Sequence, residues 1–130
     1  MQTCPCGSEK AFKECCQPLL NNLVEAATPE ALMRSRYTAY HLKNIDYIAR
    51  TMKGAATMHF NKQEVKNWAK HILWLHLEII NTEFENDYKG YVEFKATYVE
   101  GKKKYVLHEK SEFIYQNQRW YYVDGIQYQT

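Results

Sequence analysis

Val92-Glu93-Phe94-Lys95-Ala96-Thr97-Tyr98 alternates apolar and polar side chains at every step. A period of two places the apolar members of this stretch on one face of an extended strand and the polar members on the other. Three more stretches, 73–79, 106–113 and 120–123, have a strand-like pattern. Short polar turns separate the stretches 92–98, 106–113 and 120–123 from one another. The second half of the chain is therefore predicted to form an antiparallel meander.

The alternation also assigns a face to each side chain. In the first strand, Leu73, Leu75, Leu77 and Ile79 alternate with Trp74, His76 and Glu78. In the third, Leu107 and Phe113 predict that Glu109 and Ser111 share the buried face, whereas Lys110 and Glu112 point to solvent. One β-bulge would exchange His108 for Glu109 on that face.

Helical spacing precedes the strands, over about residues 28–72. Thr28 can cap a helix, Pro29 suits its first position, and Glu30 faces the positive end of the helix dipole. A shorter helix is expected over 45–52, and a third begins at Asn61. Helices followed by a meander indicate an α+β fold, with the helices on one face of the sheet.

Composition narrows the class of protein. A chain of 130 residues, 45% apolar and 25% charged, can bury one ordinary core. The formal charge of +2 would be cancelled by four thiolates on one divalent cation, so nucleic acid is not an expected partner. The polar, cysteine-rich beginning does not resemble a signal peptide, and no apolar run approaches the roughly 20 residues of a membrane span. We expect a soluble cytoplasmic protein.

All four cysteines lie in thirteen consecutive residues, at Cys4, Cys6, Cys15 and Cys16. A disulfide between Cys15 and Cys16 would be strained, a Cys4–Cys6 bond would be tight, and cross-pairing requires an oxidising compartment. A redox dithiol usually has two residues between its cysteines, whereas the gaps here are one and none. Four soft donors suit zinc best, and they close its coordination shell. A closed shell has no open position for water, so we expect one structural, noncatalytic zinc ion.

Specific residues resemble known families. Cys4-Pro-Cys-Gly-Ser-Glu-Lys-Ala-Phe-Lys-Glu-Cys-Cys16 resembles the SEC-C zinc motif, which also ends the preprotein translocase motor. The stretches 31–40, 107–113 and 119–125 resemble the YchJ-like family of small bacterial proteins. That resemblance implies a fold similar to nuclear transport factor 2 (NTF2): a curved antiparallel sheet with helices on its concave side. The expected division is a zinc knuckle at 1–20 and an NTF2-like domain at 21–130.

A cone of this kind often encloses a pocket. A buried Glu109 needs a partner, and Arg34 and Arg36, with the hydroxyls of Tyr37 and Tyr40, are the candidates. A structural ion pair between helix and sheet is the favoured interpretation. The alternative is a ligand or catalytic site built from Arg34, Arg36, Tyr37 and Glu109.

Two functions remain open. The first is an interaction or adaptor module that presents the zinc knuckle to a protein partner, and the translocase resemblance implies a secretion chaperone or the ribosome. The second is a small-molecule binder or enzyme that uses the cavity of the cone. The sequence favours the first, because no complete set of nucleophile, base and orienting group is evident and catalytic residues are not assigned.

Overall fold

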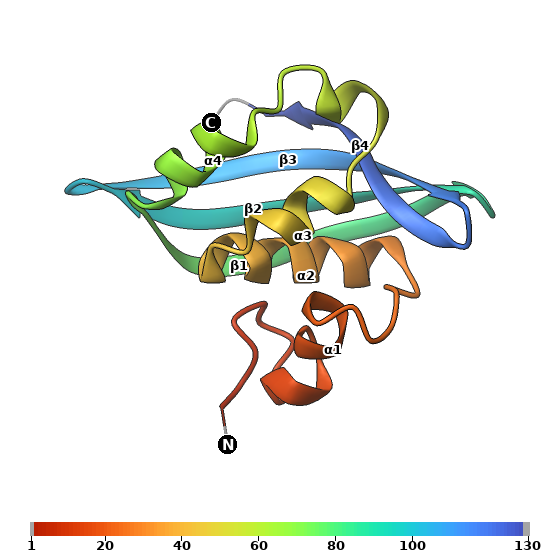
Figure 1. Ribbon diagram of the computed structural model, residues 1–130, viewed down its shortest axis with the longest axis horizontal. Coiled ribbons are helices and arrows are strands. Elements are labelled where there is room, and N and C mark those ends of the chain that lie inside the picture. The colour runs from red at the N-terminus through yellow and green to blue at the C-terminus, as the bar shows by residue number, and fades with distance from the viewer. Residues whose placement is uncertain (1, 129–130) are drawn as a thin grey trace.

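The computed structural model describes residues 2–128. Met1, Gln129 and Thr130, which belong to the outer ends of the two predicted domains, lie outside the described part. Short helices come first along the chain, and the strands follow (Figure 1). The helical elements are η1 (Phe12–Glu14), α1 (Gln17–Leu20), α2 (Pro29–Leu42), α3 (Ile45–Arg50), η2 (Gly54–Thr57) and α4 (Lys62–Ala69). The strands are β1 (Ile72–Asn86), β2 (Lys89–Glu100), β3 (Lys103–Gln116) and β4 (Arg119–Gln127).

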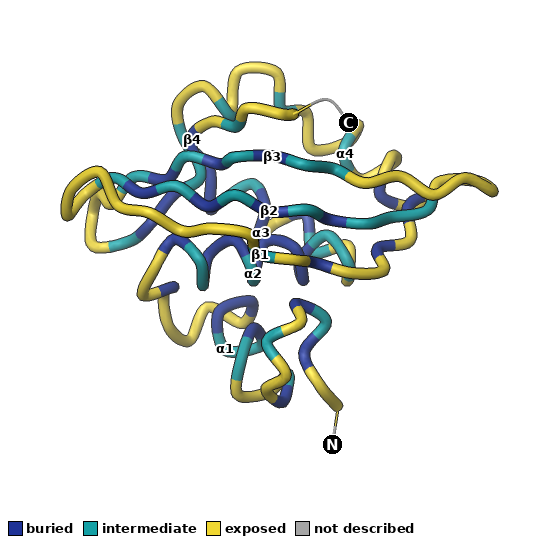
Figure 2. Tube along the Cα trace, turned by 180° about the vertical axis from the view of Figure 1, so that it is seen from behind, coloured by how far each residue is buried: buried dark blue, intermediate teal, exposed yellow. Residues whose placement is uncertain are grey.

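The four strands form one antiparallel sheet in the order β1-β2-β3-β4. Helices α2 and α3 cover one face of this sheet, and α1 with the N-terminal segment lies on the far side of α2 (Figure 1). The predicted α+β meander with an NTF2-like arrangement is confirmed. Seen from behind, β1 is largely exposed along its length, whereas buried positions alternate with half-buried ones along the middle of β2 and β3 (Figure 2).

Capping residues set the helix starts that the sequence predicts. The Thr28 hydroxyl accepts from the Ala31 amide at 3.1 Å, and the Asn61 side chain accepts from the Glu64 amide at 2.9 Å. Such caps satisfy amide groups that have no partner within the helix. In the part of the chain that the structure describes, no helix is both long and apolar enough to cross a membrane.

The face assignment of β1 is a correction. Trp74 is buried with 7% exposure, whereas Leu73 and Leu75 are 58% and 48% exposed. The register shifts between Trp74 and His76, so Leu75 is the extra residue of a β-bulge. Before the bulge the inward positions are even-numbered, and beyond it Leu77 returns to the core. Simple alternation therefore predicts the wrong face for Leu73, Trp74 and Leu75.

The cysteine segment packs on the rest of the molecule. Cys4, Cys6 and Cys16 are buried in the same apolar cluster as Leu32 of α2 and Phe94 of β2. The cysteine segment and the sheet therefore share one continuous apolar cluster. A boundary between two units at residue 20 stays a prediction.

Candidate metal centre and ligand cavity

Four thiol groups meet on the side of α2 that faces away from the sheet. The Sγ atoms of Cys4, Cys6, Cys15 and Cys16 all lie within 4.8 Å of one another, and all four cysteines are free. The Sγ atoms of Cys6 and Cys15 are 3.6 Å apart, and those of Cys15 and Cys16 are 4.0 Å apart. A tetrahedral ion with metal–sulfur bonds of about 2.3 Å separates its sulfur ligands by about 3.8 Å. The cluster could therefore hold one metal ion.

A tight backbone turn brings the two pairs of cysteines together. Gly7 has φ +82°, a conformation that other residues rarely adopt, and a Cβ there would lie 3.4 Å from the Leu77 carbonyl oxygen. The Cys4 amide donates to the Lys10 carbonyl at 2.8 Å and closes the loop. The element η1 then turns the chain so that Cys15 and Cys16 face Cys4 and Cys6.

Hydroxyl groups surround the sulfur atoms. The Thr38 hydroxyl donates to Cys16 Sγ at 3.4 Å, and Ser8 Oγ lies 3.1 Å from Cys15 Sγ. The side-chain hydrogen bond between Cys6 and Cys16 lowers the pKa of the Cys6 thiol to about 4 and raises the pKa of Cys16, and burial raises the pKa of Cys15. The hydroxyl donors favour thiolate over thiol, and thiolate is the form that binds metal.

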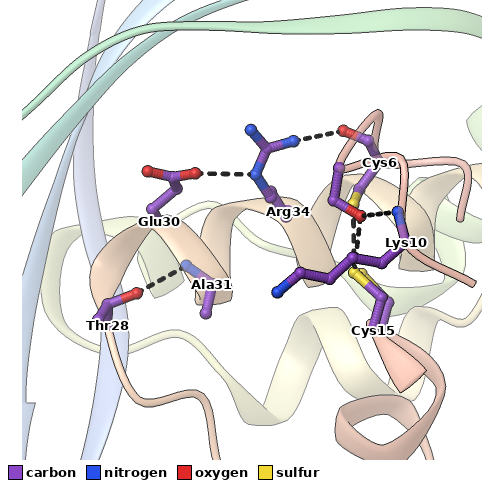
Figure 3. Close-up of polar contacts among 9 residues, drawn as sticks. Cys6, Lys10, Cys15, Thr28, Glu30, Ala31 and Arg34 are labelled. Atoms are coloured by element: carbon purple, nitrogen blue, oxygen red, sulfur yellow. Dashed lines mark hydrogen bonds and ion pairs between the residues drawn. The ribbon is translucent and has the colours of Figure 1, made fainter. Parts of the chain in front are cut away.

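Arg34 holds this segment on α2 and does not belong to the predicted pocket. Its Nη1 donates to the Cys6 carbonyl oxygen at 2.7 Å, and its Nε pairs with Glu30 at 2.9 Å (Figure 3). The placement corrects the expected grouping of Arg34 with Glu109. Residues two apart on a helix point about 200° away from each other, so Arg34 and Arg36 cannot face the same site.

A cavity of about 220 Å³ lies between α2 and the inner face of the sheet. Its apolar and aromatic walls come from α2, α4 and all four strands, and polar groups gather at one part of it. The lining residues are Met33, Arg36, Tyr37, Tyr40, Trp68, Trp74, Phe94, Ala96, Leu107, Glu109, Ser111, Tyr122 and Gln127. Three of the four predicted pocket residues, Arg36, Tyr37 and Glu109, are thus brought together.

Arg36 is a buried cation at the cavity wall. It is 5% exposed, and its Nη1 donates to the Ile48 carbonyl at 2.9 Å and to the Thr51 hydroxyl at 2.7 Å. Its guanidinium carbon lies 4.7 Å from the centre of the Tyr122 ring. Burial lowers the pKa of Arg36, because desolvation disfavours the charged form. These contacts link α2 to α3 and β4.

Glu109 is held by hydroxyl groups and not by an arginine. Its Oε2 accepts from Ser111 at 2.6 Å and from Tyr122 at 3.1 Å. Within residues 2–128 no ion pair joins Glu109 to a basic side chain, so the expected helix-to-sheet ion pair is absent there. Burial raises the pKa of Tyr122, which keeps its hydroxyl protonated and able to donate.

Sequence reasoning missed Tyr122, Trp74 and Gly125 at this site. A Cβ at Gly125 would lie 2.6 Å from the Tyr122 hydroxyl oxygen and would collide with the Glu109 carboxylate. Trp74 lines the cavity, and its indole Nε1 is buried without a partner in the described chain. Gly125 lies within β4, close to its aromatic residues, and was an available signal, because glycine in a strand often marks a close approach.

Taken together, the structure is a small α+β domain of the NTF2 class with a four-cysteine cluster packed on its first long helix. The model for the YchJ middle NTF2-like domain matches residues 28–125, and the SEC-C motif model matches residues 2–18. The chain belongs to the YchJ family, whose relatives are described as UPF0225 proteins.

Relatives and solved structures agree with this assignment. A UPF0225 protein of Shewanella sp. strain MR-7 is 38% identical over 134 residues, which cover 97% of this chain and 81% of the relative. The solution structure of a SEC-C motif protein from Rhodopseudomonas palustris has a TM-score of 0.88 at 37% identity, covering 98% of this chain and 100% of that one. A crystal structure of a SEC-C motif protein from Psychrobacter arcticus has a TM-score of 0.84 at 29% identity, covering 100% of this chain and 85% of that one.

Proposed function

We propose that this protein binds a small molecule in the cavity between α2 and the sheet, and that one structural zinc ion holds its N-terminal knuckle. The observation that carries the proposal is the cavity of about 220 Å³, which has apolar walls and contains Arg36 and Glu109. Largely apolar pockets with a few convergent polar groups are the usual form of small-molecule sites.

Zinc is proposed because of the donor set. Cys4, Cys6, Cys15 and Cys16 offer four sulfur atoms that all lie within 4.8 Å of one another, and zinc prefers closed sites of four thiolates when its role is structural. When bound, the ion supplies a crosslink among the four side chains and no open coordination position. Chain residues complete the environment: Thr38 and Ser8 donate to the sulfurs, and Arg34 fixes the Cys6 carbonyl.

A variant that fills the cavity tests ligand binding. Leu107 lines the cavity, so Leu107→Trp should fill it, whereas Val106 on the same strand is 46% exposed and faces away. We expect naphthalene, titrated into nitrogen-15-labelled protein, to shift the resonances of Ala96 and Phe94 in the wild type and in Val106→Trp. Leu107→Trp should abolish these shifts. Shifts confined to surface residues, or equal shifts in both variants, would contradict the proposal.

A protein-interaction role is a second candidate. It is favoured by Leu23 and Val24, which follow the knuckle and are 74% and 54% exposed. The partner class implied by the SEC-C resemblance is a secretion chaperone or the ribosome. A pull-down with the intact chain, with Cys15→Ser/Cys16→Ser and with Leu23→Ser/Val24→Ser tests it. We expect capture of a defined partner by the intact chain and loss with both variants. Equal capture by all three would count against it.

A further inference from the structure

We infer that the ligand of the cavity is an uncharged, flat molecule of one or two rings that carries a hydrogen-bond donor next to an acceptor, as in a lactam or a cyclic imide. This inference rests on the proposed function, because it assigns a chemical class to the same cavity. It follows from the charges at the wall, from the free donors and acceptor there, and from the size and aromatic lining of the space.

Two opposite charges face the cavity without touching each other. Arg36 and Glu109 both line it, and no nitrogen of Arg36 lies within 4.0 Å of a Glu109 oxygen, since no ion pair joins them within residues 2–128. Each is tied to protein groups on one side: Arg36 through Nη1 and Glu109 through Oε2. A ligand with a net charge is attracted by one of these groups and repelled by the other, whereas an uncharged ligand with a donor and an acceptor can satisfy both, so the pair favours an uncharged ligand.

The remaining polar atoms define what the ligand must offer. Within the described chain, Nε and Nη2 of Arg36 donate no hydrogen bond, and Oε1 of Glu109 accepts none. These three atoms are not among the fully buried unpaired side-chain atoms of the described chain, so they keep some accessible surface and a ligand in the cavity could pair with them. A carbonyl oxygen toward Arg36 and an adjacent N–H toward Glu109 would satisfy both in one planar group.

Size and lining set the body of the molecule. The cavity of about 220 Å³ exceeds the roughly 150 Å³ that holds one benzene, and it is smaller than the sites of drug-sized ligands. Trp74 lies edge-on to Trp68, at 6.1 Å between ring centres, and 5.0 Å from Tyr98. Faces and edges of aromatic rings favour a flat aromatic guest. One or two fused rings therefore fit, and phosphorylated or long-chain compounds do not.

Three probes of similar size test the class. Carbostyril is a bicyclic lactam, naphthalene has the same two rings without polar groups, and naphthoate adds a negative charge. We expect carbostyril to bind the wild-type protein about tenfold more tightly than naphthalene, which corresponds to one charge-assisted hydrogen bond. Naphthoate should bind more weakly than carbostyril because its carboxylate meets Glu109. Isothermal titration or NMR shifts at the cavity residues would measure each affinity.

The variant Glu109→Gln separates charge from shape. It should weaken the binding of carbostyril several-fold and strengthen the binding of naphthoate about tenfold. The second effect is expected because the change removes the repulsion between the Glu109 carboxylate and the carboxylate of naphthoate. Glu112→Gln, on the same strand but pointing away from the cavity, should change neither affinity. If naphthalene binds as tightly as carbostyril and Glu109→Gln has no effect, the ligand class is wrong while binding in the cavity stands. If no probe shifts the cavity resonances, the proposed function fails with it.

Discussion

Arg34 and Arg36 lie two positions apart in α2 and bind opposite sides of the molecule. Arg34 donates to the Cys6 carbonyl at 2.7 Å, whereas Arg36 donates to the Ile48 carbonyl at 2.9 Å from the cavity wall. The same helix thus carries the cysteine cluster on one face and the cavity on the other. A metal bound by the cysteines would brace a helix that also supplies Met33, Tyr37 and Tyr40 to the cavity.

Removing one thiol should loosen the knuckle and leave the sheet folded. In Cys15→Ser only three sulfur ligands remain, so the metal is lost and the segment 2–20 loses its crosslink. Hydrogen exchange followed by mass spectrometry should show exchange at least about tenfold faster in this segment, with the protection of β2 and β3 retained. Lys13→Ala, at an exposed position of the same segment, is the control. Loss of protection throughout the sheet would show that the metal is required for the whole fold.

The Arg34 contact should slow metal release. Arg34→Gln removes the hydrogen bond to the Cys6 carbonyl and the pair with Glu30, an effect we place at about 1–2 kcal/mol. A chelator should then extract the metal roughly tenfold faster than from the wild type. Arg119→Gln changes a more exposed arginine on β4 and should not alter the rate. Equal rates in the three proteins would mean that Arg34 does not hold the knuckle.

The arrangement of strands followed from side-chain periodicity, and the helix starts followed from Thr28 and Asn61. These are local signals, because capping and alternation depend on residues close in sequence. The bulge at Leu75 was not predictable in this way, since it depends on how β1 pairs with Tyr98 and Thr97 of β2. One extra residue reversed the faces of Leu73 and Trp74.

The cysteine cluster was predictable because its members lie within thirteen residues of one another. The cavity was only partly predictable. Glu109 was assigned to the buried face by alternation, but its partners Ser111 and Tyr122 depend on the pairing of β3 with β4. Arg34 and Arg36 looked equivalent as partners in sequence, and helical geometry alone separates them by about 200°.

Adding a methyl group at Gly125 should displace the Glu109 carboxylate. The new Cβ would collide with that carboxylate and with the Tyr122 hydroxyl, which are the movable ends of long side chains. Gly125→Ala should therefore weaken carbostyril binding as much as Glu109→Gln does, while the melting temperature changes by only a few degrees. Ile126→Ala, at the adjacent position, which is 66% exposed, should bind carbostyril with the affinity of the wild type. Unchanged carbostyril affinity in Gly125→Ala would contradict the assigned role of Glu109.

Stability should fall at high pH through the buried tyrosines. Burial raises the pKa of Tyr37 to about 12, above the ordinary value near 10. The unfolded chain therefore loses this proton first, so the contribution of Tyr37 to folding is complete below about pH 10 and is lost as the pH rises toward 12. The slope is about 1.4 kcal/mol per pH unit for each such tyrosine.

Urea unfolding between pH 8 and pH 11.5 would measure this slope. Tyr37→Phe should make the fall in the free energy of unfolding shallower, because phenylalanine has no proton to lose. Tyr88→Phe, at a 66% exposed position, should leave the slope as it is in the wild type. A slope that is identical in Tyr37→Phe and in the wild type would exclude Tyr37 as a source of the effect.

A crystal structure of the zinc-loaded protein grown with carbostyril would show both proposed sites at once. We expect one zinc ion among the four Sγ atoms and the lactam in the cavity, with its carbonyl toward Arg36 and its N–H toward Glu109. A cavity filled by the Tyr40 and Trp68 side chains, with carbostyril absent or bound elsewhere on the surface, would contradict this expectation.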